Sequence, residues 1–334
     1  MDVPDYDLPE GAIAQRPVEP RHSARLLDAS GPDAPPRHRQ VRDLPALVGP
    51  GDVVVVNNSR VIPARLLLAK ATGGAAEVML LEPDPADPAA WIGLVRPGRR
   101  LPPGTALHPR PGGGPVVVVG ARMGDDGRRH IRFLGPADET MTRWGTMALP
   151  PYIHAGLDDP DRYQTVYADR PGSVAAPTAG LHLTAEVLEG IAERGARVHP
   201  VDLEVGLGTF RPVTAGRAED HVMHQERYRV PAATWEACHQ ARRVIAIGTT
   251  AVRALESAAL TGRLEGASDL FIRPGFVFSV VDVLMTNFHL PRSTLLLLLE
   301  AFTGPRWRDL YAEALAGGYR FLSFGDAMIV GRAP

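Results

Sequence analysis

The sequence predicts an α/β protein in which a layered αβα domain, discontinuous in sequence, carries a small inserted β-barrel domain. Between about Val61 and Leu149, short strand-like runs are separated by proline and glycine clusters, a pattern typical of a small barrel or sandwich. On both sides of this segment, strands alternate with helices, which is typical of a layered α/β domain. We therefore expect residues 1–60 and 150–334 to form the αβα domain and residues 61–149 the barrel.

The inserted segment contains four short runs rich in β-branched and aromatic residues, which we expect to be strands. They are Glu77 to Leu81, Trp91 to Val95, Val116 to Val119 and His130 to Leu134. Residues 60–150 also hold 12 Arg and Lys against 8 Asp and Glu, whereas the remainder holds 24 against 30. The excess of positive charge has two interpretations. Either a polyanion binds to this segment, or these are ordinary solvated loop charges.

The segment PTAGLH combines residues that shape a backbone with residues that bind ligands. Pro177 restricts the backbone and Gly180 gives it conformational freedom. Thr178 offers a hydroxyl and His182 an imidazole. Thr184 then has the position of the N-cap of an amphipathic helix. The segment therefore predicts a loop that delivers backbone N–H groups to a polar or anionic ligand.

Two further junctions repeat this arrangement of strand, polar tip and helix. The first is an apolar strand at Val244–Ile247, a turn at Gly248–Thr250 and a helix. The second is an apolar strand, a polar tip at Thr286, Asn287 and His289, and a helix capped by Ser293. Since ligands of open α/β sheets lie outside the carboxyl ends of the strands, these tips predict one shared pocket.

The run VDLEVGLGTF alternates in polarity, which predicts a strand with Val201, Leu203 and Val205 on one face. Asp202 and Glu204 then lie on the other face. The loop that follows is rich in glycine and starts at Gly206.

Composition sets outer limits on the protein. A chain of 334 residues with 45% hydrophobic content can bury a core large enough for two domains. The single cysteine, Cys238, excludes an internal disulfide framework. The longest leucine run, Leu295 to Leu299, is too short to span a bilayer, and no signal-like start is seen. We expect a cytoplasmic monomer that does not contact a membrane.

Nine motifs in fixed order give the chain a recognisable pattern from end to end. They are YDLPEGAIAQRP, GDVVVVNNSRVIPARL, LPPYIH, RYQTVYADRPGSVAAPTAGLH, GLGTFRPV, HVMHQE, AIGTTAVRALES, TNFHLPRSTLL and YRFLSFGDAMIV. With these motifs, the chain resembles the S-adenosylmethionine:tRNA ribosyltransferase-isomerases of queuosine biosynthesis. The resemblance implies the same αβα domain with an inserted barrel.

The resemblance also implies a reaction. Enzymes of this family move the ribosyl part of S-adenosylmethionine onto the aminomethyl group of 7-aminomethyl-7-deazaguanine in a tRNA anticodon. The product is epoxyqueuosine, and adenine and methionine are released. S-adenosylmethionine acts as a co-substrate, and neither a metal nor a redox cofactor is implied. Such a site needs a proton acceptor, a donor for departing adenine and dry walls.

The candidate catalytic residues are His182, His289 and Glu204, because imidazole titrates near neutral pH and Glu204 lies beside the glycine-rich loop. A histidine that only bonds a backbone carbonyl is the structural alternative. The candidates for substrate binding are Arg60, Arg162, Tyr163, Gln164, Pro177, Thr178, Gly180, Gly206, Gly208, Thr209, Phe210, His221, His224, Glu226, Thr249, Thr250, Arg253 and Asn287.

Some of these residues have competing interpretations. Arg253 pairs either with the methionine carboxylate or with Glu256. His221 and His224, together with Glu226, have a spacing that metal ligands can have, but without a third clear ligand we expect polar pocket groups and no metal.

One departure from the family pattern supports an alternative function. The position of Glu204 is commonly histidine in the family, and an anion there changes neighbouring pKa values. The chain is then either the tRNA-modifying enzyme or a paralogue that uses S-adenosylmethionine on a small-molecule acceptor. A third possibility is a binding protein without turnover. Activity on a free amine would identify the paralogue, and ligand binding without adenine release would identify the binding protein.

Overall fold

The computed structural model describes residues 3–31, 34–110, 112–124, 126–206, 223 and 225–333. They form two compact units. The first comprises the chain up to Arg60, Pro150–Arg170 and the chain from Ala176 onward. The second comprises Val61–Leu149 and Pro171–Ala175.

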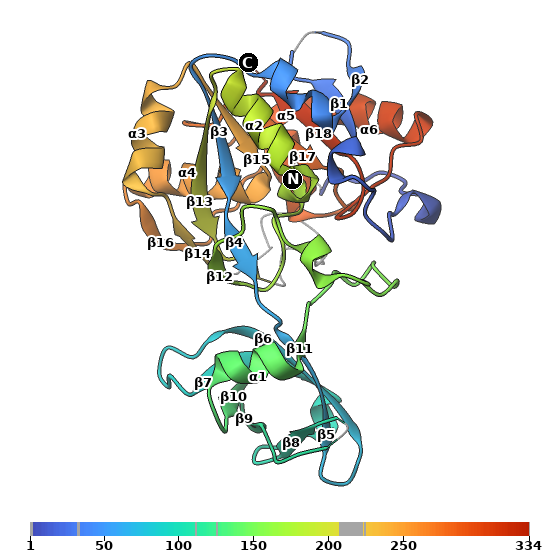
Figure 1. Ribbon diagram of the computed structural model, residues 1–334, viewed down its shortest axis with the longest axis vertical. Helices are drawn as coiled ribbons and strands as arrows, with labels where there is room; N and C mark the ends of the chain where they lie inside the picture. Colours follow the sequence, from blue (N-terminus) through green and yellow to red (C-terminus); the bar gives the residue numbers. More distant parts are fainter. Residues whose placement is uncertain are drawn as a thin grey trace. The chain divides into compact units, whose positions relative to one another are not determined.

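A nine-stranded sheet runs through the first unit (Figure 1). In spatial order its strands are β16 (Glu265–Ser268), β14 (Glu226–Arg229), β13 (Arg197–Leu203), β3 (Asp52–Asn57), β15 (Arg243–Ile247), β17 (Val283–Asn287), β18 (Ala327–Gly331), β1 (Arg25–Ala29) and β2 (Arg37–Gln40). The four central strands from β13 to β17 are parallel. Their carboxyl ends therefore meet at one edge of the sheet.

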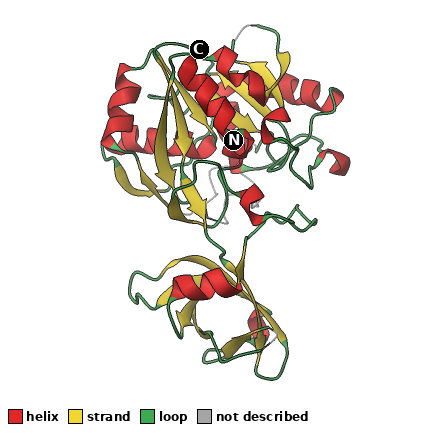
Figure 2. Cartoon of the chain, viewed as in Figure 1, coloured by secondary structure: helices red, strands yellow, loops and turns green. Residues whose placement is uncertain are grey.

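Helices cover both faces of this sheet, as Figure 2 shows. They are α2 (Ala185–Glu193), α3 (Ala232–Gln240), α4 (Thr249–Thr261), α5 (Thr294–Thr303) and α6 (Trp307–Ala316). Every residue of β3 is buried, as expected for a parallel strand between two helical layers. Val54 and Val56 of β3 pack with Val187 and Ile191 of α2 in one core cluster.

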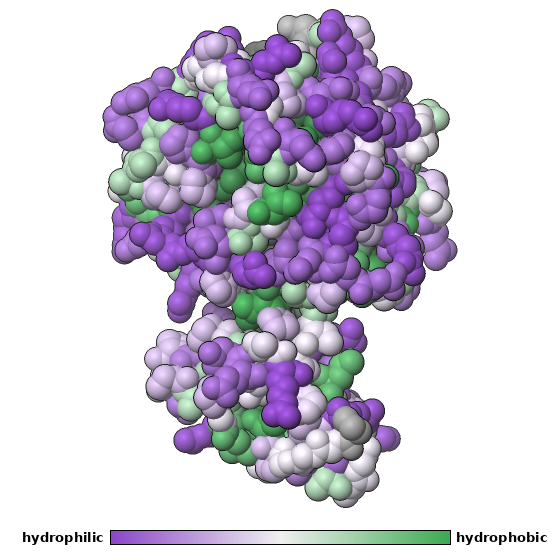
Figure 3. Space-filling model, viewed as in Figure 1, coloured by the Kyte–Doolittle hydropathy of each residue, from purple (hydrophilic) through white to green (hydrophobic). Residues whose placement is uncertain are grey.

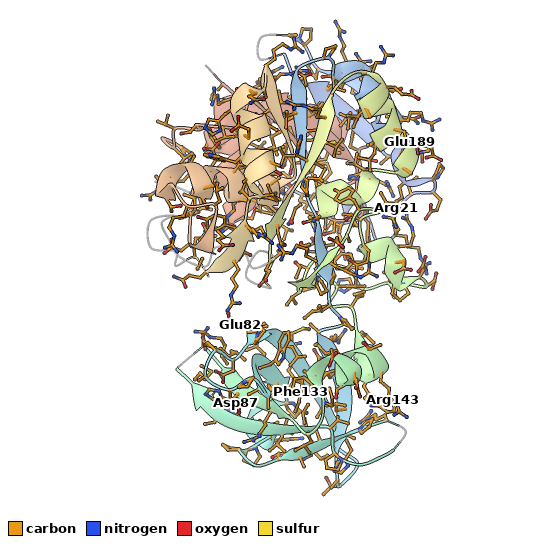
Figure 4. All side chains as sticks on the ribbon, turned by 60° about the vertical axis from the view of Figure 1, so that its left-hand side comes forward. Arg21, Glu82, Asp87, Phe133, Arg143 and Glu189 are labelled. Carbon is orange, nitrogen blue, oxygen red and sulfur yellow. The ribbon has the colours of Figure 1, made fainter. Side chains whose placement is uncertain are left out.

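The second unit is a closed antiparallel barrel. Its strands, in spatial order, are β5 (Arg65–Lys70), β6 (Ala75–Pro83), β7 (Ala90–Arg96), β10 (Arg128–Phe133), β9 (Val117–Met123) and β8 (Ala106–Pro109). Pairing of β5 with β8 closes the barrel. The short strand β11 (Gly145–Thr146) pairs antiparallel with β5. Helix α1 (Ala137–Trp144) carries Arg143, labelled in Figure 4, whose guanidinium lies 4.9 Å from the Trp144 ring centroid. A separate two-stranded sheet joins β4 (Ser59–Val61) and β12 (Arg170–Ser173).

The predicted fold class is confirmed, and the four strands predicted for the barrel are present with shifted ends. The helix after Thr184 is also confirmed, since the Thr184 hydroxyl accepts a hydrogen bond from the N–H of Val187. The predicted strand through VDLEVGLGTF is too long, because β13 ends at Leu203. The alternation of burial nevertheless continues to Val205.

The two other junctions differ in detail from the prediction. The predicted turn includes Thr249 and Thr250. In the structure these two residues form the first turn of α4, and Gly248 is its N-cap. Thr286 and Asn287 belong to β17 itself, because pairing with β18 extends that strand to its polar end.

The surface of the first unit is predominantly hydrophilic on the face that Figure 3 draws. No helix within the described ranges is long and apolar enough to cross a bilayer. Cys238, on α3, is buried, and burial raises the pKa of its thiol to about 11.

Candidate functional site

A cavity lies in the first unit at the carboxyl ends of β15 and β17. It has a volume of about 620 Å³, part of which is open to solvent. Its lining residues are Tyr152, Ala176, Pro177, Thr178, Ala179, Val205, Gly248, Thr249, Thr250, Thr286, Asn287, Phe288, His289, Leu290, Ser293, Leu295, Leu322 and Ser323. The three junctions singled out from the sequence therefore do converge on one pocket.

The β15–α4 junction supplies two hydroxyl groups. Gly248 has a φ of +91°, a conformation that side-chain-bearing residues rarely adopt, and the turn leads directly into α4. Thr249 and Thr250 therefore stand in the first helical turn, where backbone N–H groups lack helical partners. The Thr250 hydroxyl is buried and has no hydrogen-bond partner among the described residues. It is available to a ligand.

The end of β17 presents an amide and an imidazole. The Thr178 hydroxyl donates to the Asn287 side-chain oxygen at 2.9 Å, and the Asn287 amide donates to the carbonyl of Leu322 at 3.1 Å. These two bonds fix which atom of the Asn287 amide faces which neighbour. The Asn287 side chain is therefore held in one orientation at the cavity wall.

His289 is held through its main chain and its side chain. The Tyr311 hydroxyl accepts a hydrogen bond from the His289 N–H at 2.8 Å, and the Tyr6 hydroxyl donates to the His289 carbonyl. The ring Nε2 lies 3.0 Å from the Thr286 hydroxyl. Burial lowers the pKa of His289 to about 3. The imidazole is therefore neutral near pH 7.

Tyr152 and Ser323 line the cavity but are not among the candidates predicted from the sequence. Their hydroxyls lie 2.8 Å apart, and burial raises the pKa of Tyr152 to about 12. Both residues lie within motifs that carry the family resemblance, LPPYIH and YRFLSFGDAMIV. That membership is the only signal in the sequence, because neither residue stands at a strand-to-helix junction.

His182 lies elsewhere and has a different environment. It ends a short 3₁₀ helix, η6 (Thr178–His182), and lines a smaller cavity of about 260 Å³. Its two ring nitrogens lie 3.0 Å from the Ala179 carbonyl and 2.9 Å from the Gly325 carbonyl. Burial lowers its pKa. This is the environment of a histidine that ties two chain segments together.

Gly180 occupies a place where no side chain fits. A Cβ there would lie 2.0 Å from the Tyr167 hydroxyl and 3.0 Å from the Thr165 methyl carbon. The glycine is thus required by the packing of Tyr167 on η6.

The RYQ segment also lies outside the larger cavity. Arg162 forms an ion pair with Glu19 at 2.5 Å and donates to the Val18 carbonyl. Tyr163 is fully buried against Phe324. The backbone carbonyl of Gln164 accepts a hydrogen bond from Arg21, which is labelled in Figure 4. Of this segment, Arg162 lines the smaller cavity.

A buried ion pair joins β14 to α4. Arg253 Nη1 and Glu226 Oε2 are in direct contact, and the other Glu226 oxygen accepts from the N–H of Gly206 at 3.1 Å. The Nε and Nη2 atoms of Arg253 are buried without a partner among the described residues. The predicted alternative pairing of Arg253 with Glu256 is wrong, because Glu256 instead accepts three backbone N–H bonds from residues 279–281.

The remaining candidates lie in three different situations. Glu204 is half-buried directly after β13 and does not line the cavity, whereas its neighbour Val205 does. Arg60 is exposed in β4. Gly208, Thr209, Phe210, His221 and His224 lie outside the described residues. Within the part of the chain that is described, no three His, Cys, Asp or Glu side chains gather as a metal site.

The fold and the cavity together define an α/β protein with a cavity at the carboxyl edge of its sheet. A family model described as queuosine biosynthesis protein matches residues 2–330. The chain belongs to this family, so the resemblance seen in its motifs is confirmed.

Relatives across nearly the whole length support this assignment. The S-adenosylmethionine:tRNA ribosyltransferase-isomerase of Rubrobacter xylanophilus is 48% identical, covering 98% of this chain and 97% of that protein. The protein of the same name from Thermus thermophilus is 49% identical, covering 99% of each chain.

A solved structure agrees with the fold. The crystal structure of the S-adenosylmethionine tRNA ribosyltransferase from Thermotoga maritima matches with a TM-score of 0.55 and 35% sequence identity. The match covers 98% of this chain and 99% of that one. The likeness therefore includes both compact units.

Proposed function

We propose that this protein transfers and isomerises the ribosyl moiety of S-adenosylmethionine onto the aminomethyl group of 7-aminomethyl-7-deazaguanine in tRNA. The products are epoxyqueuosine in the tRNA, adenine and methionine. The observation that carries the proposal is near-full-length identity of 48–49% to relatives that bear this enzyme's name. The cavity at the ends of β15 and β17 is the proposed site.

The first chemical requirement is a proton acceptor. The positive sulfonium acidifies the protons on the adjacent ribose carbon, so a base that removes one starts ring opening and loss of adenine. His289 is the residue that we propose for this role, because it lines the cavity and its neutral ring has one nitrogen with a lone pair. Its hydrogen bond with Thr286 orients the ring.

A second requirement is exclusion of water from the sulfonium. Part of the cavity wall is apolar and is formed by Val205, Leu290, Leu295 and Leu322. In such surroundings a charged reactant interacts more strongly with the few polar groups present, and hydrolysis of reactive intermediates is suppressed.

The polar groups of the cavity support a proposed orientation of the co-substrate. Thr249 and Thr250, at the start of α4, are suited to a carboxylate or a ribose, because a helix N-terminus attracts negative charge. Arg253, one turn further, does not line this cavity and pairs with Glu226, so we propose Thr249 and Thr250 for the methionine carboxylate. Asn287 offers an amide to the adenine edge.

The paralogue with a small-molecule acceptor is the less favoured alternative. Its motivation is Glu204, which does not line the described cavity. High identity to relatives with the tRNA enzyme's name also argues against it. We further propose that the protein acts as a cytoplasmic monomer and uses no metal.

The test is to incubate the purified protein with S-adenosylmethionine and tRNA that carries the aminomethyl-deazaguanine base. Adenine release and the mass of the modified nucleoside are then followed. We expect equal amounts of adenine and epoxycyclopentane adduct, unchanged by a metal chelator. Adduct on a free aminomethyl-deazaguanine base but not on tRNA would support the paralogue. S-adenosylmethionine binding without adenine release would support the binding protein.

A further inference from the structure

Arginines gather at one part of the barrel, around the β9–β10 hairpin and the end of β7. They are Arg99 and Arg100 in the short 3₁₀ helix η4 (Gly98–Arg100), Arg122 near the end of β9, and Arg129 near the start of β10. We call these four residues the arginine cluster. Arg99, Arg100 and Arg122 are exposed.

The backbone brings the four residues together. Arg122 and Arg129 are directly opposed across the β9–β10 pair, so their side chains leave the ladder on the same face. The Nη2 of Arg129 donates to the carbonyl of Gly98 at 3.0 Å, which places η4 and its two arginines beside this pair. A register shift between Arg129 and Ile131 marks an irregularity at the same point, a device that re-aims side chains.

Among the residues that the structure describes, the cluster has no negative partners. Arg129 is only 6% exposed and its Nη1 has no hydrogen-bond partner among the described residues. Within the described ranges, none of Arg99, Arg100 and Arg122 pairs with a carboxylate. Like charges opposed across a strand pair destabilise a sheet, and a buried guanidinium with an unused donor adds to that cost. A bound anion from outside the chain would reduce the repulsion between the arginines and accept a hydrogen bond from the unused donor.

The neighbouring Arg128 shows the contrast. It lies on the other face of β10, since side chains alternate along a strand, and it pairs with Asp126 at 2.5 Å and with Glu82 at 3.9 Å. Glu82 is labelled in Figure 4. Among the described residues, the hairpin therefore has one arginine that is paired with carboxylates, on one face, and two arginines without such partners, on the other.

We propose that the arginine cluster is a docking surface for the sugar–phosphate backbone of the tRNA substrate. Guanidinium groups bind phosphate oxygens through paired N–H donors, and contacts of this kind fix position without reading sequence. The surplus of 12 basic over 8 acidic residues in residues 60–150, within a chain of net charge -2, favours a polyanion at this unit. This inference rests on the proposed function for the identity of the polyanion.

The test compares two substitutions on one hairpin, Arg122→Gln and Arg128→Gln, which change the net charge equally. Binding of unmodified tRNA is measured from about 50 to about 300 mM salt, the range over which phosphate contacts are strongly screened. We expect Arg122→Gln to reduce the log–log salt slope by about one, as for the loss of one phosphate contact, and Arg128→Gln to leave it unchanged. The variant with Arg99, Arg100 and Arg122 all replaced by Gln should weaken binding roughly tenfold or more at low salt.

Kinetics separate this inference from the proposed function. In the triple variant, KM for tRNA should rise, while KM for S-adenosylmethionine and kcat stay at the wild-type values. Equal effects of Arg122→Gln and Arg128→Gln, or a wild-type slope in the triple variant, would overturn the docking surface. Wild-type protein that binds tRNA through these arginines but makes no adduct would leave the surface standing and refute the reaction. Since all three residues are exposed, the folded state should be retained.

Discussion

Two turns that look alike in the sequence place their histidines in different environments. The η6 turn ends in His182, whose ring nitrogens both face backbone carbonyls. The turn after β17 contains His289, whose ring lies on the cavity wall and faces a hydroxyl. Carbonyls only accept hydrogen bonds, whereas a hydroxyl can donate or accept. The first environment ties His182 to two chain segments, and the second leaves the His289 ring on the cavity wall beside a group that can donate or accept a hydrogen bond.

The difference shows that a polar loop before a capped helix does not specify what its side chains face. In the β17 turn, pairing of Thr286 and Asn287 with β18 fixes the register, and two tyrosines hold the His289 peptide. In η6, the 3₁₀ turn directs His182 toward Gly325 instead. Tertiary contacts from distant parts of the chain therefore separate the two roles.

The largest expected effect is on turnover, in the pair His289→Gln and His182→Gln. If His289 is the proton acceptor, kcat for adenine release should fall about 10²-fold or more, since general acid–base groups contribute roughly 10²–10⁴-fold. His182→Gln should instead lose about 1–3 kcal/mol of unfolding free energy, because a buried carbonyl loses its donor. Steady-state kinetics and urea unfolding on both variants measure the two quantities.

The opposite pattern would reverse the assignment. If His182→Gln abolished turnover at unchanged stability and His289→Gln remained active, the smaller cavity that His182 shares with Arg162 would become the candidate reaction site.

A second pair of substitutions tests whether η6 is built for packing. Gly180→Ala places a methyl group 2.0 Å from the Tyr167 hydroxyl, and overpacking of this kind costs about 1–3 kcal/mol. Gly206→Ala meets no described residue within 4 Å and should leave stability unchanged. Thermal unfolding of both variants is the measurement. Equal melting temperatures would show that Tyr167 moves aside freely and that Gly180 is not a packing requirement.

Much of the fold could be predicted from the sequence. The short barrel strands and the parallel strands with polar ends follow from local patterns, because burial and strand propensity act residue by residue. The site could be predicted only in part. The predicted strand-to-helix junctions converge on the larger cavity and bring to its wall Thr178, Thr250, Asn287 and His289. Tyr152 and Ser323 come from segments 171 residues apart, and no local pattern pairs them.

Acidification gives a smaller effect that both histidines share. In each, burial holds the folded-state pKa below the ordinary value of 6.5. Below the ordinary pKa, the unfolded chain therefore binds more protons than the folded chain. This contribution to the free energy of unfolding is highest above about pH 6.5 and falls as the pH drops toward the folded pKa. For His289, with a folded pKa of about 3, the loss between pH 7 and pH 5 is about 2 kcal/mol.

Urea unfolding at both pH values should show this loss in the wild type and a correspondingly smaller one in His289→Gln. An unchanged pH dependence in the variant would mean that His289 does not titrate on unfolding as its burial requires.

The smallest effect concerns the residues that position His289. In Tyr311→Phe the His289 N–H loses its acceptor, and in Tyr6→Phe the His289 carbonyl loses a donor. Each hydrogen bond is worth about 1 kcal/mol, so a full loss of alignment at the transition state corresponds to roughly a fivefold lower kcat. Neither tyrosine lines the larger cavity, so KM for S-adenosylmethionine should not change.

Kinetics and stability together separate positioning from simple support of the fold. A merely structural role would lower the melting temperature of these variants and leave kcat unchanged. A fall in kcat at constant KM that disappears when His289 is already replaced by Gln would show that the two hydroxyls act through this histidine. Since His182 has no such pair of tyrosines on its peptide, that coupling would belong to the β17 turn and not to η6.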